Sequence, residues 1–268
     1  MVIDFHNVGH GNCAVVTSPE GKRLMIDCGH DSELPWFPSV HYNGFDIENL
    51  IISNFDEDHV SDLVDLMKNT KLSFITRNRS VSSSVLKQMK NRYGMGTGIK
   101  RLYGWMESVE GKASSGKSAQ YGSVNVESYW NEYPLDFRDE NNLSVITFVE
   151  YSGFRAVFTG DLEISGWKKL LERDYICKKL MHVNVFVASH HGRDSGCCDE
   201  VFKICSPQIV LMSDKGKQFD TQNTTSWYKH RSSGIDFNGG RRHVFTTRKD
   251  GAIRIEVGPS HWNISTQN

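Results

Sequence analysis

The 268-residue sequence predicts a mixed α/β fold in which two sheets pack together and helices cover their outer surfaces. Strand-like runs open the chain without helices between them, and later strand runs alternate with amphipathic stretches. Reactive side chains follow several of these strands directly. A hydrophobic content of 38% and a charged content of 24% are ordinary for a globular protein.

The first strands are predicted from β-branched and aromatic runs separated by Gly-rich or Pro-Glu-Gly turns. They are VIDFHNV (2–8), CAVVTS (13–18), RLMIDCG (23–29) and NLIIS (49–53). A helix is predicted next, because apolar residues recur at helical spacing. These residues are Val60, Leu63, Val64, Leu66 and Met67.

The second half of the chain alternates strands and helices. The predicted strands are LSVITFVEY (143–151), FRAVFTGD (154–161), VNVFVASHH (183–191) and QIVLMS (208–213). Helices are predicted over ISGWKKLLERD (164–174) and DEVFKIC (199–205). The Arg-Lys-Asp-Gly turn in RHVFTTRKDGAIRIEV (242–257) predicts a terminal β-hairpin.

The bulk composition excludes several classes of protein. A formal charge of -1 excludes a globally basic nucleic-acid binder, so any basic surface must be local. No run approaches the roughly 20 apolar residues that a membrane span needs, so no membrane partner is expected. The six cysteines are too sparse for a disulfide scaffold. We therefore expect a cytoplasmic protein.

The stretch IISNFDEDHVSDL (51–63) ends a buried run with three adjacent carboxylates and His59. Such carboxylates repel each other unless water or a cation screens them. A calcium loop is excluded, because its sixth and twelfth positions hold Ser61 and Met67 instead of Gly and Glu. An acidic, solvated helix N-terminus stays open as an alternative to a metal site.

Two further strand ends carry the same ligand chemistry. Asp161 follows the AVFTG run, and His190 and His191 end the VFVAS run. Carboxylates and imidazoles at the ends of three buried strands can converge on one point. Together they form a nitrogen and oxygen ligand set that binds zinc, manganese or iron.

The ordered motifs NVGHGNC, LMIDCG, SNFDEDHVSDL, NNLSVITFVEYSGFRAVFTGDLE and FVASHHG resemble the metallo-β-lactamase superfamily. They are most similar to the stand-alone, ComEC-type branch of that family. The resemblance covers residues 2 to about 67 and 141 to about 257. It implies an α/β (α+β) fold, the four-layer αββα sandwich of the metallo-β-lactamase type. It also implies one domain over 1–268, with a basic insertion at about 71–134.

The resemblance also assigns metal ligands. The family signature His-x-His-x-Asp-His reads Asn54-Phe55-Asp56-Glu57-Asp58-His59 in this chain. Asp58 and His59 thus match ligands of the second metal site, and Asp161 matches the carboxylate that bridges both metals. His190 or His191 matches the late histidine, and we assign His190 as the ligand.

The first metal position departs from the family pattern. Asn54 and Asp56 replace its two histidines, and Asn141–Asn142 lie near a third, so this position is oxygen-rich or vestigial. Oxygen ligands favour manganese or magnesium there. One or two Zn²⁺ or Mn²⁺ ions are expected overall. The expected ligands are Asn54, Asp56, Asp58, His59, Asp161 and His190.

Three further acidic residues are weighed for supporting roles. Asp27 matches a family position that orients the ligands, although a turn-capping role is equally consistent with its place after a strand. Asp214 and Asp220 are weaker candidates, in a region where many relatives carry a histidine.

The middle of the chain is locally basic, with only Glu107 and Glu110 as acidic residues between positions 68 and 118. Aromatic residues are interspersed there, as on surfaces that bind phosphates and stack bases. A solvated face or a partner-docking surface is the alternative. GKASSGKS (111–118) has the P-loop pattern but lacks the flanking strand and helix, and is interpreted as a mobile basic loop. The expected substrate-binding residues are Lys87, Lys90, Arg92, Lys100 and Arg101.

The expected function is metal-dependent hydrolysis of a phosphodiester in DNA or RNA through a metal-bound hydroxide. Asp58 and His191 are the expected catalytic residues, with His191 protonating the leaving oxygen. One alternative is a small-molecule hydrolase acting on a lactone, thioester or cyclic nucleotide. The other is a non-catalytic module with a degenerate metal site. Nucleic acid is the expected partner, and the sequence specifies no partner protein.

Overall fold

The computed structural model describes residues 1–111, 118–215 and 223–267. One sheet has the strand order β15-β14-β1-β2-β3-β4-β5. The strands β3, β4 and β5 run parallel, whereas the other neighbours are antiparallel. The bounds are β1 Val2–Phe5, β2 Ala14–Thr17, β3 Arg23–Ile26, β4 Asp46–Ile51, β5 Lys71–Thr76, β14 Ile253–Val257 and β15 Trp262–Thr266.

The other large sheet has the order β13-β10-β9-β8-β7-β6. Its strands β6, β7 and β8 are antiparallel, and β8, β9, β10 and β13 are parallel. A separate hairpin joins β11 Ile235–Phe237 to β12 Gly240–Arg242. The bounds are β6 Asn125–Tyr129, β7 Ile146–Tyr151, β8 Phe154–Phe158, β9 Val185–Val187, β10 Ile209–Met212 and β13 Val244–Thr246.

The two sheets bury a common core between them. Alternating residues of each strand point into it, as in β14, where Ile253, Ile255 and Val257 are buried and the residues between them are exposed. Phe158 and Phe245 meet them from the opposite sheet. Full burial of one such side chain stabilises the fold by about 1.5–3 kcal/mol.

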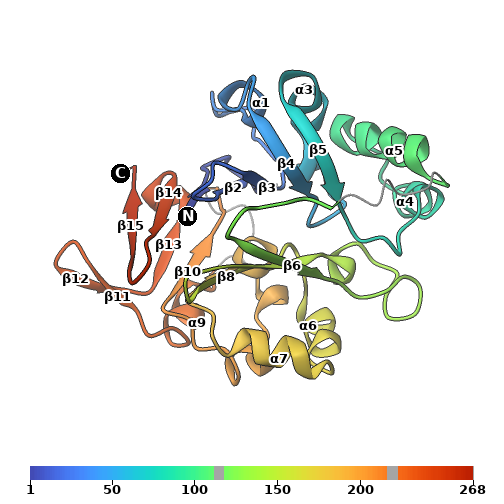
Figure 1. Cartoon of the computed structure of the whole chain (residues 1–268). Coiled ribbons are helices and arrows are strands. Elements are labelled where there is room, and N and C mark those ends of the chain that lie inside the picture. Colours follow the sequence, from blue (N-terminus) through green and yellow to red (C-terminus); the bar gives the residue numbers. More distant parts are fainter. Residues whose placement is uncertain (112–117, 216–222, 268) are drawn as a thin grey trace.

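Helices cover both outer faces, so the predicted four-layer αββα sandwich is confirmed (Figure 1). One layer lies on the β1–β5 side and includes α1 Pro38–His41, α2 Glu57–Val60, α3 Leu63–Asn69, α4 Ser83–Met89 and α5 Thr97–Val109. The opposite layer includes α6 Ile164–Leu170, α7 Asp174–Leu180, α8 Asp199–Phe202 and α9 Thr225–Lys229. Three short 3-10 turns are η1 Asn141–Leu143, η2 Ser189–Gly192 and η3 Asp194–Gly196.

The predicted terminal hairpin is wrong. β13 and β14 lie in different sheets, and the short helix α10 Thr247–Asp250 joins them. The Thr246 side chain caps this helix by accepting the Lys249 N–H, and the Asp250 carboxylate accepts the Thr246 N–H. Gly251 ends the helix with a φ of 67°. The chain therefore crosses between the sheets where a tight turn was predicted.

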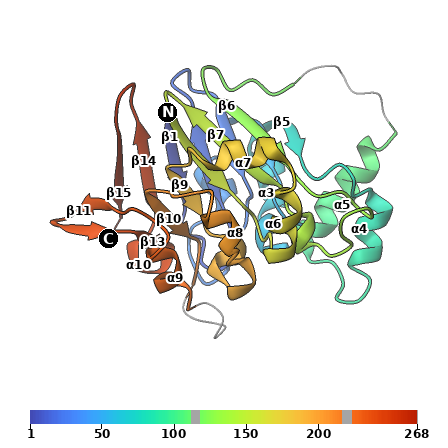
Figure 2. The same cartoon turned by 90° about the horizontal axis from the view of Figure 1, so that it is seen from below.

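The segment 71–134 is part of both sheets at its ends. It begins with β5 at the edge of one sheet and contains β6 at the edge of the other. Between them, α4 and α5 pack together beside the sandwich (Figure 2). We refer to residues 83–109, which contain these two helices, as the basic segment.

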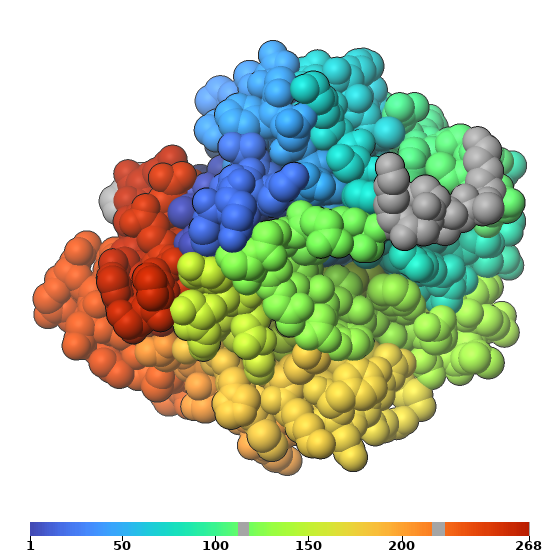
Figure 3. Space-filling view, in the orientation of Figure 1, coloured from blue at the N-terminus to red at the C-terminus, as the bar shows by residue number. Residues whose placement is uncertain are grey.

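The two ends of the described chain pair with each other. β1 is antiparallel to β14, and the Met1 amino group donates to the Val257 carbonyl over 3.0 Å. Figure 3 shows the blue N-terminal and red C-terminal residues in contact on one face. Within residues 1–111, 118–215 and 223–267, no helix has the length and apolar character to cross a bilayer.

Candidate metal centre

Four ligand-type residues from distant parts of the chain meet at one end of the sandwich. Asp58 and His59 lie in α2, which follows β4, whereas Asp161 follows β8 and His191 follows β9. One ligand atom from each lies within 4.8 Å of the others. His59 Nε2 is 3.2 Å from Asp161 Oδ1, and His191 Nε2 is 3.2 Å from Asp58 Oδ2. We call this set the four-residue cluster.

The two imidazoles of the cluster have the chemistry of metal ligands. Nε2 of His59 and Nε2 of His191 are buried and find no hydrogen-bond partner in the described chain. Their Nδ1 atoms contact Asp27 Oδ2 at 2.8 Å and the Ser213 carbonyl at 3.0 Å, respectively. A carbonyl or carboxylate oxygen at Nδ1 favours a proton there and a lone pair on Nε2. Two such lone pairs and two carboxylates fit a divalent cation.

The electrostatics of the cluster also fit a cation. Burial alone would raise the pKa of Asp58 and Asp161, but His59 and His191 together outweigh it and hold the pKa of both carboxyls below the usual range. Burial would lower the pKa of His59, yet Asp161 and Asp27 raise it well above its ordinary value. Both carboxylates are therefore ionised. A bound metal would displace only the proton on Nε2 of each imidazole, so metal affinity depends on pH.

Close backbone packing fixes the position of Asp58. Its carbonyl accepts the Asn12 N–H over 3.3 Å, and the Gly29 N–H donates to the Asn12 carbonyl over 2.9 Å. A Cβ on Gly29 would lie 1.7 Å from the Asp58 carbonyl oxygen. Position 29, in the loop that follows β3, therefore requires glycine.

The histidine pair has an unusual backbone. His190 and His191 have φ values of 51° and 52°, in the left-handed region that non-glycine residues seldom adopt. The His190 N–H donates to the Gly160 carbonyl over 3.0 Å, which ties this turn to the loop that carries Asp161. Backbone strain of this kind is often concentrated at functional sites.

The structure reverses the assignment predicted for the histidine pair. His191 belongs to the four-residue cluster, whereas His190 Nε2 lies 3.6 Å from the other Asp161 oxygen, Oδ2. His190 Nδ1 is 3.0 Å from Ser195 Oγ. The left-handed turn rotates the second histidine inward, and strand periodicity does not predict such a turn.

Asn54 and Asp56 lie outside the four-residue cluster, and their role as ligands at the first metal position stays a prediction. The Asn54 amide is buried and hydrogen-bonded within its loop, where its oxygen accepts the Asp56 N–H over 2.9 Å. Asp56 forms an ion pair with Lys90 at 2.5 Å. Lys90 is itself only 8% exposed and lines a cavity, and its role in binding substrate stays a prediction.

The other predicted substrate-binding residues lie on the surface of the basic segment. Lys87, Arg92, Lys100 and Arg101 are all exposed. The Arg92 guanidinium lies 5.2 Å from the ring centre of Tyr93, which is 82% exposed. A cavity of about 430 Å³ separates this segment from the loops of the centre, with Tyr93 and Lys90 in its lining.

Asp27 contacts a ligand and supports the loop around it. It is fully buried, accepts the Ser53 N–H over 2.7 Å and the Asn12 side-chain amide over 2.9 Å, and contacts His59. Asp214 lies outside the cluster in an ion pair with Arg248 at 3.2 Å. Asp220 and most of the GKASSGKS stretch lie outside the described residues.

Sequence reasoning missed His10. Its Nε2 lies 3.6 Å from Asp58 Oδ2, and its ring centre lies 4.7 Å from that of His191. Burial lowers the pKa of His10 to about 4, so the imidazole is neutral at pH 7. A histidine between two glycines in the loop after the first strand, as in "VGHG", was the available signal.

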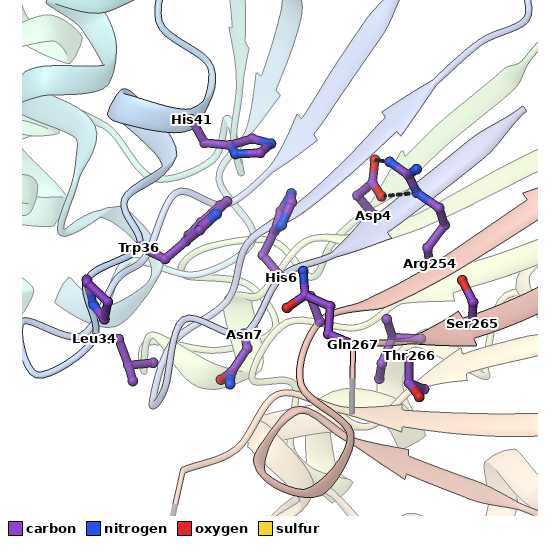
Figure 4. Close-up of a pocket in the computed structure, with 13 residues that line it drawn as sticks. Asp4, His6, Asn7, Leu34, Trp36, His41, Arg254, Ser265, Thr266 and Gln267 are labelled. Atoms are coloured by element: carbon purple, nitrogen blue, oxygen red, sulfur yellow. Dashed lines mark hydrogen bonds and ion pairs between the residues drawn. The ribbon is translucent and has the colours of Figure 1, made fainter.

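Another cavity, of about 470 Å³, lies beside β1, β14 and the loop before α1 (Figure 4). His6 stacks on Trp36 there with ring centres 4.2 Å apart, and Arg254 pairs with Asp4 at 2.7 Å. No member of the four-residue cluster lines this cavity.

Comparison with known proteins agrees with this fold and site. A family model described as the metallo-β-lactamase superfamily matches residues 6–78. That match and the αββα layers agree with the predicted resemblance to the metallo-β-lactamase superfamily, and the four-residue cluster lies where the chain could hold a divalent ion.

Particular relatives refine this class. The chain is 21% identical over 231 residues to ComE operon protein 3 of Bacillus subtilis (strain 168), which confirms the predicted ComEC-type resemblance. The match covers 79% of this chain and 28% of that longer protein.

The solved structure of CmlA shows the same fold at low identity. CmlA, a diiron β-hydroxylase from Streptomyces venezuelae, superposes with a TM-score of 0.51 and 13% identity, over 85% of this chain and 51% of CmlA. The metallo-β-lactamase fold protein YhfI from Bacillus subtilis superposes with a TM-score of 0.49 and 10% identity, over 93% and 98% of the respective chains.

Proposed function

We propose that the protein is a metal-dependent phosphodiesterase or nuclease that acts on DNA or RNA. The observation that carries this proposal is the attachment of the basic segment to the residues next to Asp58. Glu57 accepts the N–H groups of Gly98 and Ile99 over 2.7 and 3.0 Å, at the start of α5. A surface rich in lysine and arginine thus lies beside the metal ligands.

The chemistry of the basic segment suits a polyanion. Exposed lysine and arginine side chains attract phosphate groups and release their counterions. The exposed Tyr93 ring offers a face on which a base can stack, and such stacking is tolerant of sequence. Substrates with a phosphate backbone and unpaired bases match this combination.

The residues of the centre have distinct roles in the proposed reaction. A divalent ion held by Asp58, His59, Asp161 and His191 would lower the pKa of water and neutralise charge on the phosphoryl oxygens. Asp27 and the Ser213 carbonyl keep the two imidazole rings oriented toward that ion. His10 is neutral at pH 7 and lies at the edge of the cluster, which supports a role as proton acceptor.

The test is degradation of single- and double-stranded DNA and RNA in the presence of Mn²⁺ or Zn²⁺. We expect Asp58→Ala to lower the rate by more than about 100-fold, because it removes a ligand. The double variant Lys100→Glu/Arg101→Glu should weaken nucleic-acid cleavage but spare a small chromogenic phosphodiester. Lys203→Glu, an exposed site in the opposite helix layer, is the matched control.

A small-molecule hydrolase is the second candidate. The cavity of about 430 Å³ beside Lys90 and Tyr93 has the size of a small-ligand pocket. In that case the charge reversals on α5 should leave activity on the natural substrate unchanged. Equal nucleic-acid cleavage by the double variant and the Lys203→Glu control would therefore favour this candidate.

A further inference from the structure

A series of hydrogen-bonded polar residues connects Asp161 to Asn54 and Asp56, the two residues expected to bind a second ion. Ser144 Oγ accepts both the Asp161 N–H, over 3.2 Å, and the Asn54 side-chain amide, over 3.0 Å. Asn54, which occupies the first position of the family signature, is therefore linked to Asp161 through Ser144.

The orientation of the Asn54 amide is fixed. Its oxygen accepts the Asp56 N–H, so its NH₂ group must point the other way, toward Ser144 and the Asn141 oxygen, 3.3 Å away. Asn141 in turn donates to Glu163 over 3.2 Å. The amide thus presents hydrogen-bond donors on the Asp161 side, and such donors repel a cation.

The carboxylates nearby are already neutralised by a lysine. Lys90 Nζ lies 2.5 Å from Asp56 Oδ1 and 3.2 Å from Glu140 Oε1. Burial alone would lower the pKa of Lys90, but these two carboxylates raise it, so the group stays charged. A buried ammonium ion with two carboxylate partners is a stable arrangement, whereas removal of either partner is costly.

We infer that the Lys90 ammonium group is a built-in cation that replaces the second metal ion, so that the centre binds a single divalent ion. Lys90 and Asp56 both line the cavity of about 430 Å³ together with Glu57, the neighbour of Asp58, so this fixed positive charge lies beside the signature loop. The inference depends on metal binding by the four-residue cluster but not on the proposed nucleic-acid substrate.

The experiment is titration of metal-free protein with Mn²⁺, followed by elemental analysis of the gel-filtered product. We expect a single ion per chain in the wild type and a second ion in Lys90→Met, because that change frees the Asp56 and Glu140 carboxylates. Electron paramagnetic resonance should show isolated Mn²⁺ in the wild type and spin-coupled Mn²⁺ in the variant. Lys87→Met, at an exposed site on the same helix, should keep a single ion.

Several outcomes would overturn the inference. Two ions in the wild type would overturn it, whether or not Lys90→Met folds. A single ion in folded Lys90→Met would also overturn it. Lys90→Arg, which keeps the charge, should also bind a single ion. Failure of every variant and the wild type to bind metal would instead overturn the metal centre. Loss of nuclease activity alone would leave the inference standing.

Discussion

At the scale of single residues, the centre depends on groups that never touch the metal position. Asp27 has a φ of 58° and is fully buried, which is a costly place for an aspartate. Its carboxylate accepts hydrogen bonds from the Ser53 N–H and the Asn12 amide and contacts the Nδ1 atom of His59. Asp27 therefore fixes both the ring orientation and the tautomer of a ligand.

Asp27→Asn should weaken Mn²⁺ or Zn²⁺ binding by about 10–100-fold, the usual effect of removing a ligand's hydrogen-bond partner. The amide has the same shape as the carboxylate, but only its oxygen can accept hydrogen bonds. The His59 ring therefore loses its fixed tautomer. Competition with a chelating dye measures the affinity. Asp65→Asn, on the exposed side of α3, should bind metal like the wild type. Unchanged affinity in Asp27→Asn would mean that the ring is oriented by other contacts.

Gly29→Ala should lower the free energy of unfolding by about 3 kcal/mol, because its Cβ would overlap the backbone of Asp58. Gly104→Ala is the matched comparison, since a Cβ at this position of α5 meets nothing within 4 Å. It should stabilise the protein by about 0.5–1 kcal/mol through its higher helix propensity. Urea unfolding measures both, and equal effects would show that the close packing at Gly29 is relieved by backbone movement.

At the scale of elements, the edge strand β6 is held by a side chain from another element. β6 is an edge strand, and its Glu127 accepts from Lys179 of α7 over 2.6 Å and from the Tyr129 hydroxyl over 2.5 Å. The hydrogen bond from Lys179 is the main reason that the pKa of Glu127 is lowered to about 2. The pairing thus fastens the strand to the helix layer that covers it.

The Glu127–Lys179 pairing should make a pH-dependent contribution to stability. Because the folded pKa is depressed, the contribution is present above the unfolded pKa of about 4.3 and is lost as the pH falls toward 2. Glu127→Gln should cost about 0.5–1 kcal/mol at pH 7, since solvent screens a partly exposed pair, and less at pH 3. Urea unfolding at the two pH values tests this, with the exposed Glu132→Gln as control. A cost that does not change with pH would contradict it.

At the scale of the whole molecule, the metal centre joins the two halves of the sandwich. Asp58 and His59 follow a strand of one sheet, whereas Asp161 and His191 follow strands of the other. An ion bound by all of them would act as a cross-link between two layers that share an apolar core. Metal binding should therefore stabilise the entire fold and not one loop.

Saturating Mn²⁺ or Zn²⁺ should raise the thermal midpoint by roughly 5–10 °C, since a ligand at 100 times its Kd contributes about 2.7 kcal/mol. EDTA should reverse the shift, and differential scanning fluorimetry follows it. Asp161→Asn should show little metal-dependent shift, because it removes a carboxylate central to the cluster. The same shift in Asp161→Asn and in the wild type would place the bound metal elsewhere.

Local signals in the sequence determined much of this protein. Alternating apolar runs marked the strands β1 to β4 and β7 to β10, because side chains of a strand alternate between its two faces. Ligand residues directly after those strands identified Asp58, His59 and Asp161, since strand ends gather at one edge of a sheet. The layer architecture followed from the order of strands and helices together with the family resemblance.

Only the tertiary structure decided features that depend on contacts between distant segments. His191 joins the four-residue cluster in place of His190 because of a left-handed turn anchored to Gly160. His10 lies close to the cluster because its loop packs against Asp58. Lys90 pairs with Asp56 across 34 positions of the sequence, and sequence spacing does not predict such a contact. The same holds for the chain crossing from β13 in one sheet to β14 in the other. Sequence patterns report local geometry, whereas charge pairing and ligand choice are set by which segments the fold brings within a few ångströms.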